Sequence, residues 1–178
     1  MFRRRVAELD RRADAAFDRV RGNRVADRVF YGASALGDHS VIWLMVGAAR
    51  ALGSERRLRS AVRMAAFLGV ESFLVNVVIK SFFRRGRPSL SEPRPLPLRQ
   101  PATSSFPSGH SSAAFLAAAL LSEDDQLWPL YYGLAVLVAS SRVYVRDHHT
   151  SDVLAGAAIG AVVGRVLRRF APLGSRLK

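Results

Sequence analysis

Five apolar runs separated by short polar segments dominate the chain, and this pattern predicts helices that cross a membrane. The runs cover residues 40–52, 60–83, 110–121, 127–145 and 152–170. A spanning helix needs about 20 apolar residues, so the first and third runs must borrow flanking residues or tilt little. We therefore expect an all-α, multi-span transmembrane helix bundle with five spans.

Two further helices are predicted before the first span. Residues 3–21 place apolar side chains at helical spacing among arginines and acids, which predicts an amphipathic helix that lies on the membrane surface or docks on its own domain. Residues 25–37 are apolar but too short to span, so we expect an interfacial helix there. The chain then divides into an N-terminal arm (1–24), a membrane-embedded domain (25–170) and a basic C-terminal tail (171–178).

Glycine and proline positions refine this outline. The fifth run carries Gly156, Gly160 and Gly164, and a spacing of four places them on one helix face. Small residues on one face predict close packing against another helix in the membrane. The segment 84–109 holds six of the eight prolines, so we expect a loop outside the lipid or buried in protein.

The charge of the chain fits a membrane protein better than a nucleic-acid binder. There are 27 Lys+Arg against 14 Asp+Glu, yet 49% of the residues are hydrophobic. The basic residues lie between the apolar runs and are not interleaved with aromatic residues, so no base-stacking surface is expected. The absence of cysteine excludes disulfides, thiolate metal sites and a cysteine nucleophile. No apolar stretch directly follows the first arginines, so a cleavable signal peptide is not expected.

Three polar clusters are predicted to meet on one side of the membrane. They are Lys80 to Pro88 with Arg87, then Pro107-Ser108-Gly109-His110, and then Ser141-Arg142 with His148 and Asp152. The second span ends and the third begins on the same side, and the fourth returns to that side. Topology alone therefore brings segments that are distant in sequence to one face.

The residue types in these clusters predict a phosphate-binding site. Lys80, Arg87 and Arg142 supply three positive charges, and the arginine fork matches phosphate oxygens. Ser108 and Gly109 precede a helix, and backbone N–H groups at a helix N-terminus bind anions. The glycine also permits close approach of the backbone.

Two histidines supply the expected chemistry. One imidazole of the pair His110 and His148 can attack phosphorus, and the other can protonate the leaving oxygen. Asp152 lies one helical turn after His148 and is placed to accept a hydrogen bond from its ring. His149 lies three residues before Asp152, so spacing alone does not choose between His148 and His149 as the nucleophile.

Simpler interpretations exist for each cluster alone. Arg84 and Arg85 are typical of snorkelling anchors at a membrane interface. Ser108 is also explained as a helix cap. A non-catalytic protein that binds anionic lipid would use the same basic pocket. Ionisable groups at a membrane edge are costly and usually functional, however, so their convergence favours a reactive site.

In its three motifs the sequence resembles the type 2 phosphatidic acid phosphatase family. The family motifs read Lys-x6-Arg-Pro, Pro-Ser-Gly-His and Ser-Arg-x5-His-x3-Asp, and every spacing matches over about residues 25–170. The resemblance implies that His148 is the nucleophile, that Asp152 orients it and that His110 is the general acid. It also implies a set of residues that hold the phosphoryl oxygens: Lys80, Arg87, Ser108, Gly109 and Arg142.

The same resemblance implies the reaction and its setting. Hydrolysis would pass through a phospho-histidine and need no metal or other cofactor. The implied partners are a lipid phosphate substrate and membrane lipids in a cell membrane, and no nucleic acid. Candidate substrates are a polyprenyl pyrophosphate or decaprenylphosphoryl phosphoribose, with phosphatidic acid and phosphatidylglycerol phosphate as alternatives. Many members have six spans, where five are expected here.

Two membrane orientations follow from the sequence. If residues 25–37 do not cross, the arm and the three clusters share a side, and the positive-inside rule places the clusters in the cytoplasm. If residues 25–37 do cross, the arm lies on the opposite side with the basic tail, and the clusters face outward. The sequence leaves both orientations open.

Overall fold

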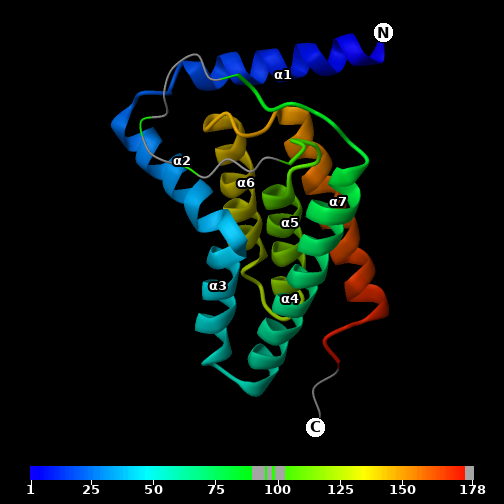
Figure 1. The fold of residues 1–178 in the computed structure, drawn as a ribbon. Coiled ribbons are helices and arrows are strands. Elements are labelled where there is room, and N and C mark those ends of the chain that lie inside the picture. The colour runs from blue at the N-terminus through cyan, green and yellow to red at the C-terminus, as the bar shows by residue number, and fades with distance from the viewer. Residues whose placement is uncertain (90–94, 96–97, 99–102, 175–178) are drawn as a thin grey trace.

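The structure, a computed structural model, is a bundle of helices with one helix lying across one end (Figure 1). It describes residues 1–89, 95, 98 and 103–174, and that part of the chain contains no strand. The elements are α1 (Phe2–Asp18), α2 (Arg24–Gly37), α3 (Val41–Ala51), α4 (Glu55–Phe73), α5 (Gly109–Leu121), α6 (Trp128–Tyr144) and α7 (Thr150–Phe170), with a 3-10 turn η1 (Asp38–Ser40) and a π-helical turn η2 (Leu74–Ile79).

The segment expected as an interfacial helix is instead the first half of a longer one. Helices α2 and α3 join through η1 into a 28-residue segment, Arg24–Ala51, which is long and apolar enough to cross a membrane. Glu55–Ile79 and Thr150–Phe170 also qualify, whereas α5 is apolar but shorter. Within the described residues only these three segments reach spanning length and hydropathy, so the expected count of five is not confirmed.

Helix α5 forms the centre of the bundle. It packs against α4, α6 and α7, and Ala114, Leu116 and Ala117 on it are fully buried. Its 13 residues are mostly alanine, serine and leucine, which lets neighbouring backbones approach closely. A helix enclosed in this way does not need to match the thickness of the lipid on its own.

The glycine face predicted on α7 packs directly on α5, which confirms that interpretation. A Cβ atom at Gly156 would lie 2.2 Å from the carbonyl oxygen of Ser108, and one at Gly160 would lie 2.0 Å from that of Ser112. Only glycine allows this approach, since real contacts of that length do not occur. The contact brings the N-terminal ends of α5 and α7, and with them two of the three motifs, side by side.

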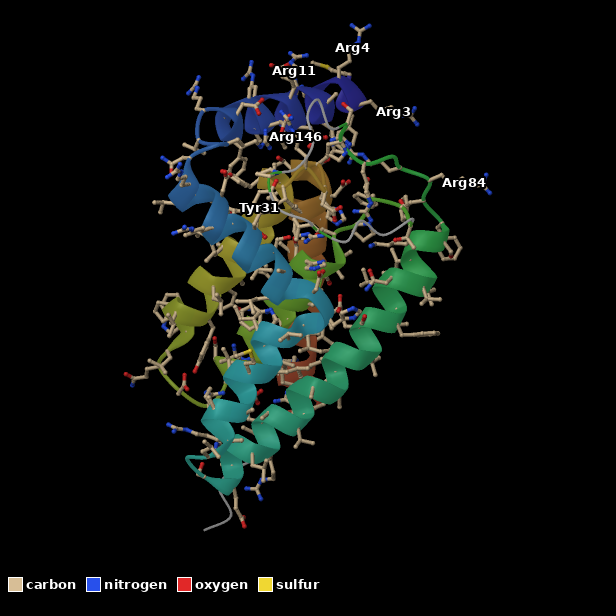
Figure 2. The ribbon with its side chains drawn as sticks, turned by 60° about the vertical axis from the view of Figure 1, so that its left-hand side comes forward. Arg3, Arg4, Arg11, Tyr31, Arg84 and Arg146 are labelled. Carbon is tan, nitrogen blue, oxygen red and sulfur yellow. The ribbon has the colours of Figure 1, made fainter. Side chains whose placement is uncertain are left out.

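Helix α1 is docked on the bundle at the end where α5 and α7 begin (Figure 1). The ring of Phe17 makes edge contacts with Tyr144 and Phe30, at centroid distances of 5.9 and 5.8 Å. The arginines Arg3, Arg4 and Arg11 project away from the bundle (Figure 2). Of the two alternatives for this amphipathic helix, docking on its own domain therefore holds for the side that faces the bundle.

Ion pairs hold the opposite end of the bundle together. Arg50 contacts Asp124 and Asp125 at 2.7 Å each, and Arg63 contacts Glu123 at 2.5 Å. These pairs tie the α3–α4 end to the α5–α6 loop, far from the three motifs. Residues 175–178 of the expected basic tail lie outside the described residues.

Candidate active site

A cavity of about 290 Å³ brings the three motifs together. It opens among η1, η2, the first turn of α5 and the segment between α6 and α7. Six of the eight predicted site residues line it: Lys80, Arg87, Gly109, His110, Arg142 and His148. The other two, Ser108 and Asp152, are fully buried behind this wall.

Asp147 organises the cationic side of the cavity. Arg142, in the last turn of α6, donates hydrogen bonds to the Ser34 hydroxyl and to the Asp147 carboxylate. A nitrogen of Arg87 lies 2.8 Å from the same carboxylate and donates to the Asp147 carbonyl at 2.8 Å. Shared pairing with one carboxylate holds both guanidinium groups side by side at the cavity.

The electrostatics of Asp147 match this role. Burial alone would raise the pKa of its carboxyl group, but the charges of Arg142, His148 and Arg87 outweigh burial and hold the pKa below its usual value. Asp147 therefore stays ionised. Sequence reasoning missed Asp147 and Ser34, although the position of Asp147 directly before His148 was a usable signal.

The imidazole of His148 is held in one orientation by a backbone carbonyl. Its Nδ1 atom lies 2.6 Å from the carbonyl oxygen of Ser105, and its side chain is 2% exposed. Because a carbonyl only accepts, this hydrogen bond assigns the proton to Nδ1 and leaves Nε2 as the nitrogen that carries the lone pair. Nε2 lies 3.5 Å from a nitrogen of Arg87. Burial lowers the pKa of His148, which favours the neutral, nucleophilic ring.

Asp152 supports His148 less directly than expected. Its carboxylate oxygen lies 3.8 Å from Nδ1 of His148, which is beyond hydrogen-bonding distance. The carboxylate instead accepts from the backbone N–H of His149 at 2.9 Å and from Arg85 at 2.6 Å. As the third residue of α7 it caps the first turn of that helix, so its oxygens are directed to the backbone. Ser105 takes the contact that spacing had suggested for Asp152.

Arg85 is a structural link, so its interpretation as an interfacial anchor is wrong. It donates to Asp152, to the Ser151 hydroxyl at 2.7 Å and to Asp10 of α1 at 2.7 Å. Asp10 also accepts from the backbone N–H of Ser151 at 2.7 Å. The anchor interpretation suits Arg84, whose side chain projects outward (Figure 2).

We predict that Arg85→Ala lowers the free energy of unfolding by about 1–3 kcal/mol, because it leaves the carboxylates of Asp10 and Asp152 without their charged partner. The same change at Arg84 is expected to alter stability by no more than about 0.5 kcal/mol. Thermal unfolding of both variants in one detergent measures the difference. Equal stability of the two variants would show that the contacts of Arg85 with Asp10 and Asp152 do not stabilise the fold.

A kink between α2 and α3 places Asp38 against His110. His39 and Ser40 adopt φ values of 51° and 60°, a left-handed conformation that costs about 1–3 kcal/mol for such residues. Nε2 of His110 donates to the Asp38 carboxylate at 2.7 Å. The strained turn thus gives the predicted general acid a carboxylate partner, which sequence reasoning did not find.

The start of α5 shows which residues face the cavity. Ser108 accepts a hydrogen bond from the backbone N–H of Ser111 at 3.4 Å, so its side chain caps the helix. Gly109 lines the cavity, and a Cβ atom there would lie 2.5 Å from the side-chain oxygen of Asn76. A side chain at position 109 would therefore have to displace the side chain of Asn76.

The structure separates the two adjacent histidines. His148 faces the cationic cavity, whereas His149 is absent from its lining. Both histidines border a second hollow beside α1, together with Asp14 and Arg85, so His148 lines both spaces and His149 only the second. Geometry therefore favours His148 over His149 as the group that meets a phosphate.

Lys80 has the electrostatic environment of a phosphate-binding residue. It follows η2 directly and is 7% exposed. Burial, and after it the charge of Arg87, lowers the pKa of Lys80 to about 8. The ammonium group is therefore charged below about pH 8 and loses its charge as the pH rises through that value.

We predict that kcat/KM for a lipid phosphate falls at least about tenfold between pH 7 and pH 9.5, because neutral Lys80 no longer attracts the phosphate. The profile of kcat/KM reports the free enzyme, to which this pKa belongs. In Lys80→Arg the guanidinium stays charged, so this alkaline fall should disappear. Steady-state assays across pH measure both profiles, and an unchanged fall in the arginine variant would assign it to another group.

Comparison with known proteins gives matches over most of the chain. The sequence model described as the PAP2 superfamily matches residues 60–173. Decaprenylphosphoryl-5-phosphoribose phosphatase from Mycobacterium tuberculosis (strain ATCC 25618 / H37Rv) is 33% identical over 136 residues, which cover 76% of this chain and 75% of that protein. Undecaprenyl-diphosphatase BcrC from Bacillus subtilis (strain 168) is 29% identical over 118 residues, covering 65% and 60%.

A solved structure is also similar. The transmembrane PAP2 type phosphatidylglycerolphosphate phosphatase from Bacillus subtilis superposes with a TM-score of 0.73 at 25% identity. The superposition covers 97% of this chain and 89% of that one.

Proposed function

Because this chain belongs to the PAP2 superfamily, we propose that it is a membrane phosphatase that removes the terminal phosphate from a polyprenyl-linked phosphosugar. One observation carries the proposal. The buried His148 has its Nδ1 fixed by Ser105, and it lines a cavity together with three cations, Lys80, Arg87 and Arg142. That arrangement suits attack on a phosphoryl group.

The reaction follows from this geometry. The Nε2 lone pair of His148 attacks phosphorus and forms an N–P bond, while the bond from phosphorus to the leaving oxygen breaks. The pair of His110 and Asp38 delivers a proton to that oxygen. Water then attacks the phospho-histidine, gives up a proton to His110 and releases inorganic phosphate. The cations bind the phosphoryl oxygens in both steps and stabilise the charge that develops on them.

The relatives support the substrate class. Those with the longest alignment are named decaprenylphosphoryl-5-phosphoribose phosphatase, and others are named undecaprenyl-diphosphatase and phosphatidylglycerophosphatase B. A phosphosugar on a polyprenyl carrier is therefore the first choice. Polyprenyl diphosphate, phosphatidic acid and phosphatidylglycerol phosphate are the alternatives.

A substrate panel tests the proposal. The purified protein in detergent is given decaprenylphosphoryl 5-phosphoribose, undecaprenyl diphosphate, phosphatidic acid and phosphatidylglycerol phosphate, and phosphate release is measured. We expect the highest kcat/KM for the phosphoribose lipid. Phosphate release from none of the four, with binding retained, would favour the non-catalytic lipid-binding alternative.

We further propose that the cavity faces the cytoplasm of a bacterial cell. Residues 25–37 form one candidate span together with α3 and not a span of their own, so the arm stays on the side of the three motifs. The docking of α1 places its arginines on the side of the cavity, and cytoplasmic segments carry the excess of Arg and Lys. The chain has no cysteine, so single cysteines report position cleanly. In intact cells a membrane-impermeant maleimide should label Gly53→Cys, at the opposite end, and leave Arg4→Cys unlabelled. The reverse pattern would place the site outside.

A further inference from the structure

Glu71 is a buried carboxyl group in the cavity for which phosphate chemistry has no use. It lies on α4, is 4% exposed and lines the same cavity as His148 and Lys80. Neither of its carboxylate oxygens makes a hydrogen bond of normal geometry to the residues that the structure describes. Its polar neighbours are the Ser112 hydroxyl and the more distant charge of Lys80. Ionisable groups inside a membrane domain are costly and usually functional.

The π-helical turn η2 explains how Glu71 and Lys80 reach one cavity. The two residues are nine positions apart, which is about two and a half turns of a regular α-helix, so they would lie on opposite faces. The wider π turn between them, over Leu74–Ile79, changes this register. Asn76, within the π turn, lines the same cavity. Such turns are frequent at functional sites.

The chemistry of this wall indicates what it binds. A carboxyl group beside a second phosphate is repelled, and beside a hydrocarbon chain it stays without hydrogen-bond partners. Hydroxyl groups satisfy it, and its two oxygens match a pair of neighbouring hydroxyls. Ser72 and Asn76 add polar atoms on the same wall. Of the candidate substrates, the phosphosugar lipid places two neighbouring hydroxyls on the sugar ring that carries the phosphate.

We propose that Glu71 is a specificity-determining residue that binds the hydroxyl groups of the sugar attached to the phosphate. This inference rests on the proposed phosphatase function and adds the means of selection. The cations hold the phosphate, and Glu71 with its polar neighbours holds the leaving group. Binding both parts together would favour a phosphosugar over a simple lipid phosphate.

A matched pair of substrates tests this role. The probes are farnesylphosphoryl ribose 5-phosphate and its 2,3-dideoxy analogue, which differ only in the two hydroxyls. For the unaltered protein we expect kcat/KM to be about 10–100-fold higher with the hydroxyls, the range for hydrogen bonds to a charged group. In Glu71→Leu the two substrates should differ by less than about threefold, since the partner of the hydroxyls is gone. Glu71→Gln keeps one acceptor and should give an intermediate ratio.

The outcomes separate the two proposals. Glu55→Gln, an exposed glutamate at the start of the same helix, is the control and should keep the selectivity of the unaltered protein. If Glu71→Leu lowers kcat/KM equally for both probes, Glu71 is structural and the inference fails while the phosphatase function stands. If the unaltered protein hydrolyses both probes at equal rates, the inference about Glu71 fails, and no variant is needed to show this. Hydrolysis of neither probe overturns the proposed function itself.

Discussion

Replacement of His148 by alanine is expected to lower kcat by about 10⁴-fold or more, the scale seen when a covalent nucleophile is removed. His148 lines the cationic cavity, and the other imidazoles that line it are those of His110, which is paired with Asp38, and His39 in the turn η1. Phosphate release by the purified variant measures the loss, and its thermal unfolding shows that the fold remains. Turnover above about one per cent of normal would contradict a nucleophilic role.

The trapped intermediate gives a second readout of the same prediction. Because Ser105 holds Nδ1 of His148, the phosphoryl group must form its bond to Nε2. Acid-labile label from a ³²P-phosphate donor should therefore appear as the Nε2 isomer of phospho-histidine, and only when His148 is present. His149→Ala is the control, since its ring borders the other hollow. That variant should keep activity within about threefold, as for a residue without a catalytic contact.

Replacement of His110 by asparagine is expected to lower kcat for a lipid phosphate by about 10²–10⁴-fold, the usual contribution of general acid catalysis. The loss should shrink strongly with p-nitrophenyl phosphate, because nitrophenolate leaves without a proton. Comparing the two substrates in one variant measures this dependence on the leaving group. An equal loss with both would show that His110 binds phosphate and does not deliver a proton.

Replacement of Asp38 tests the same proton transfer, with a smaller expected effect. Asp38→Asn keeps the size of the side chain but removes the charge that faces His110 at 2.7 Å. We expect a smaller loss, about tenfold, with the same dependence on the leaving group. An equal loss of kcat with both substrates would show that Asp38 only maintains the shape of the strained turn.

Motif spacing and helix periodicity were sufficient to predict much of the site. The two helix termini that carry Gly109 and Thr150 had to meet once the glycines of α7 packed on α5. Six of the eight predicted residues line one cavity. Their catalytic roles stay predictions, which the variants above address.

Other features depend on contacts that no local pattern encodes. Asp38 and Ser34 are single polar residues whose partners lie on other elements. Arg85 looked like an interfacial anchor because its acidic partners, Asp10 and Asp152, are distant in sequence. The joining of α2 and α3 was hidden because the left-handed residues His39 and Ser40 form a kink where the sequence suggested that the helix ends.

The link from Asp10 to Arg85 and Ser151 has a consequence for biogenesis. These contacts join positions 75 and 141 residues apart, so the first helix to leave the ribosome waits for partners that are made much later. Until then its acidic and aromatic face stays open, and Asp152 does not yet exist. A nascent chain that stops at the end of α6 already has Lys80, His110 and Arg142 but not His148, so we expect it to be inert towards phosphate esters. We therefore expect catalytic competence to arise only after the chain beyond α6 has been made and α7 has packed on α5.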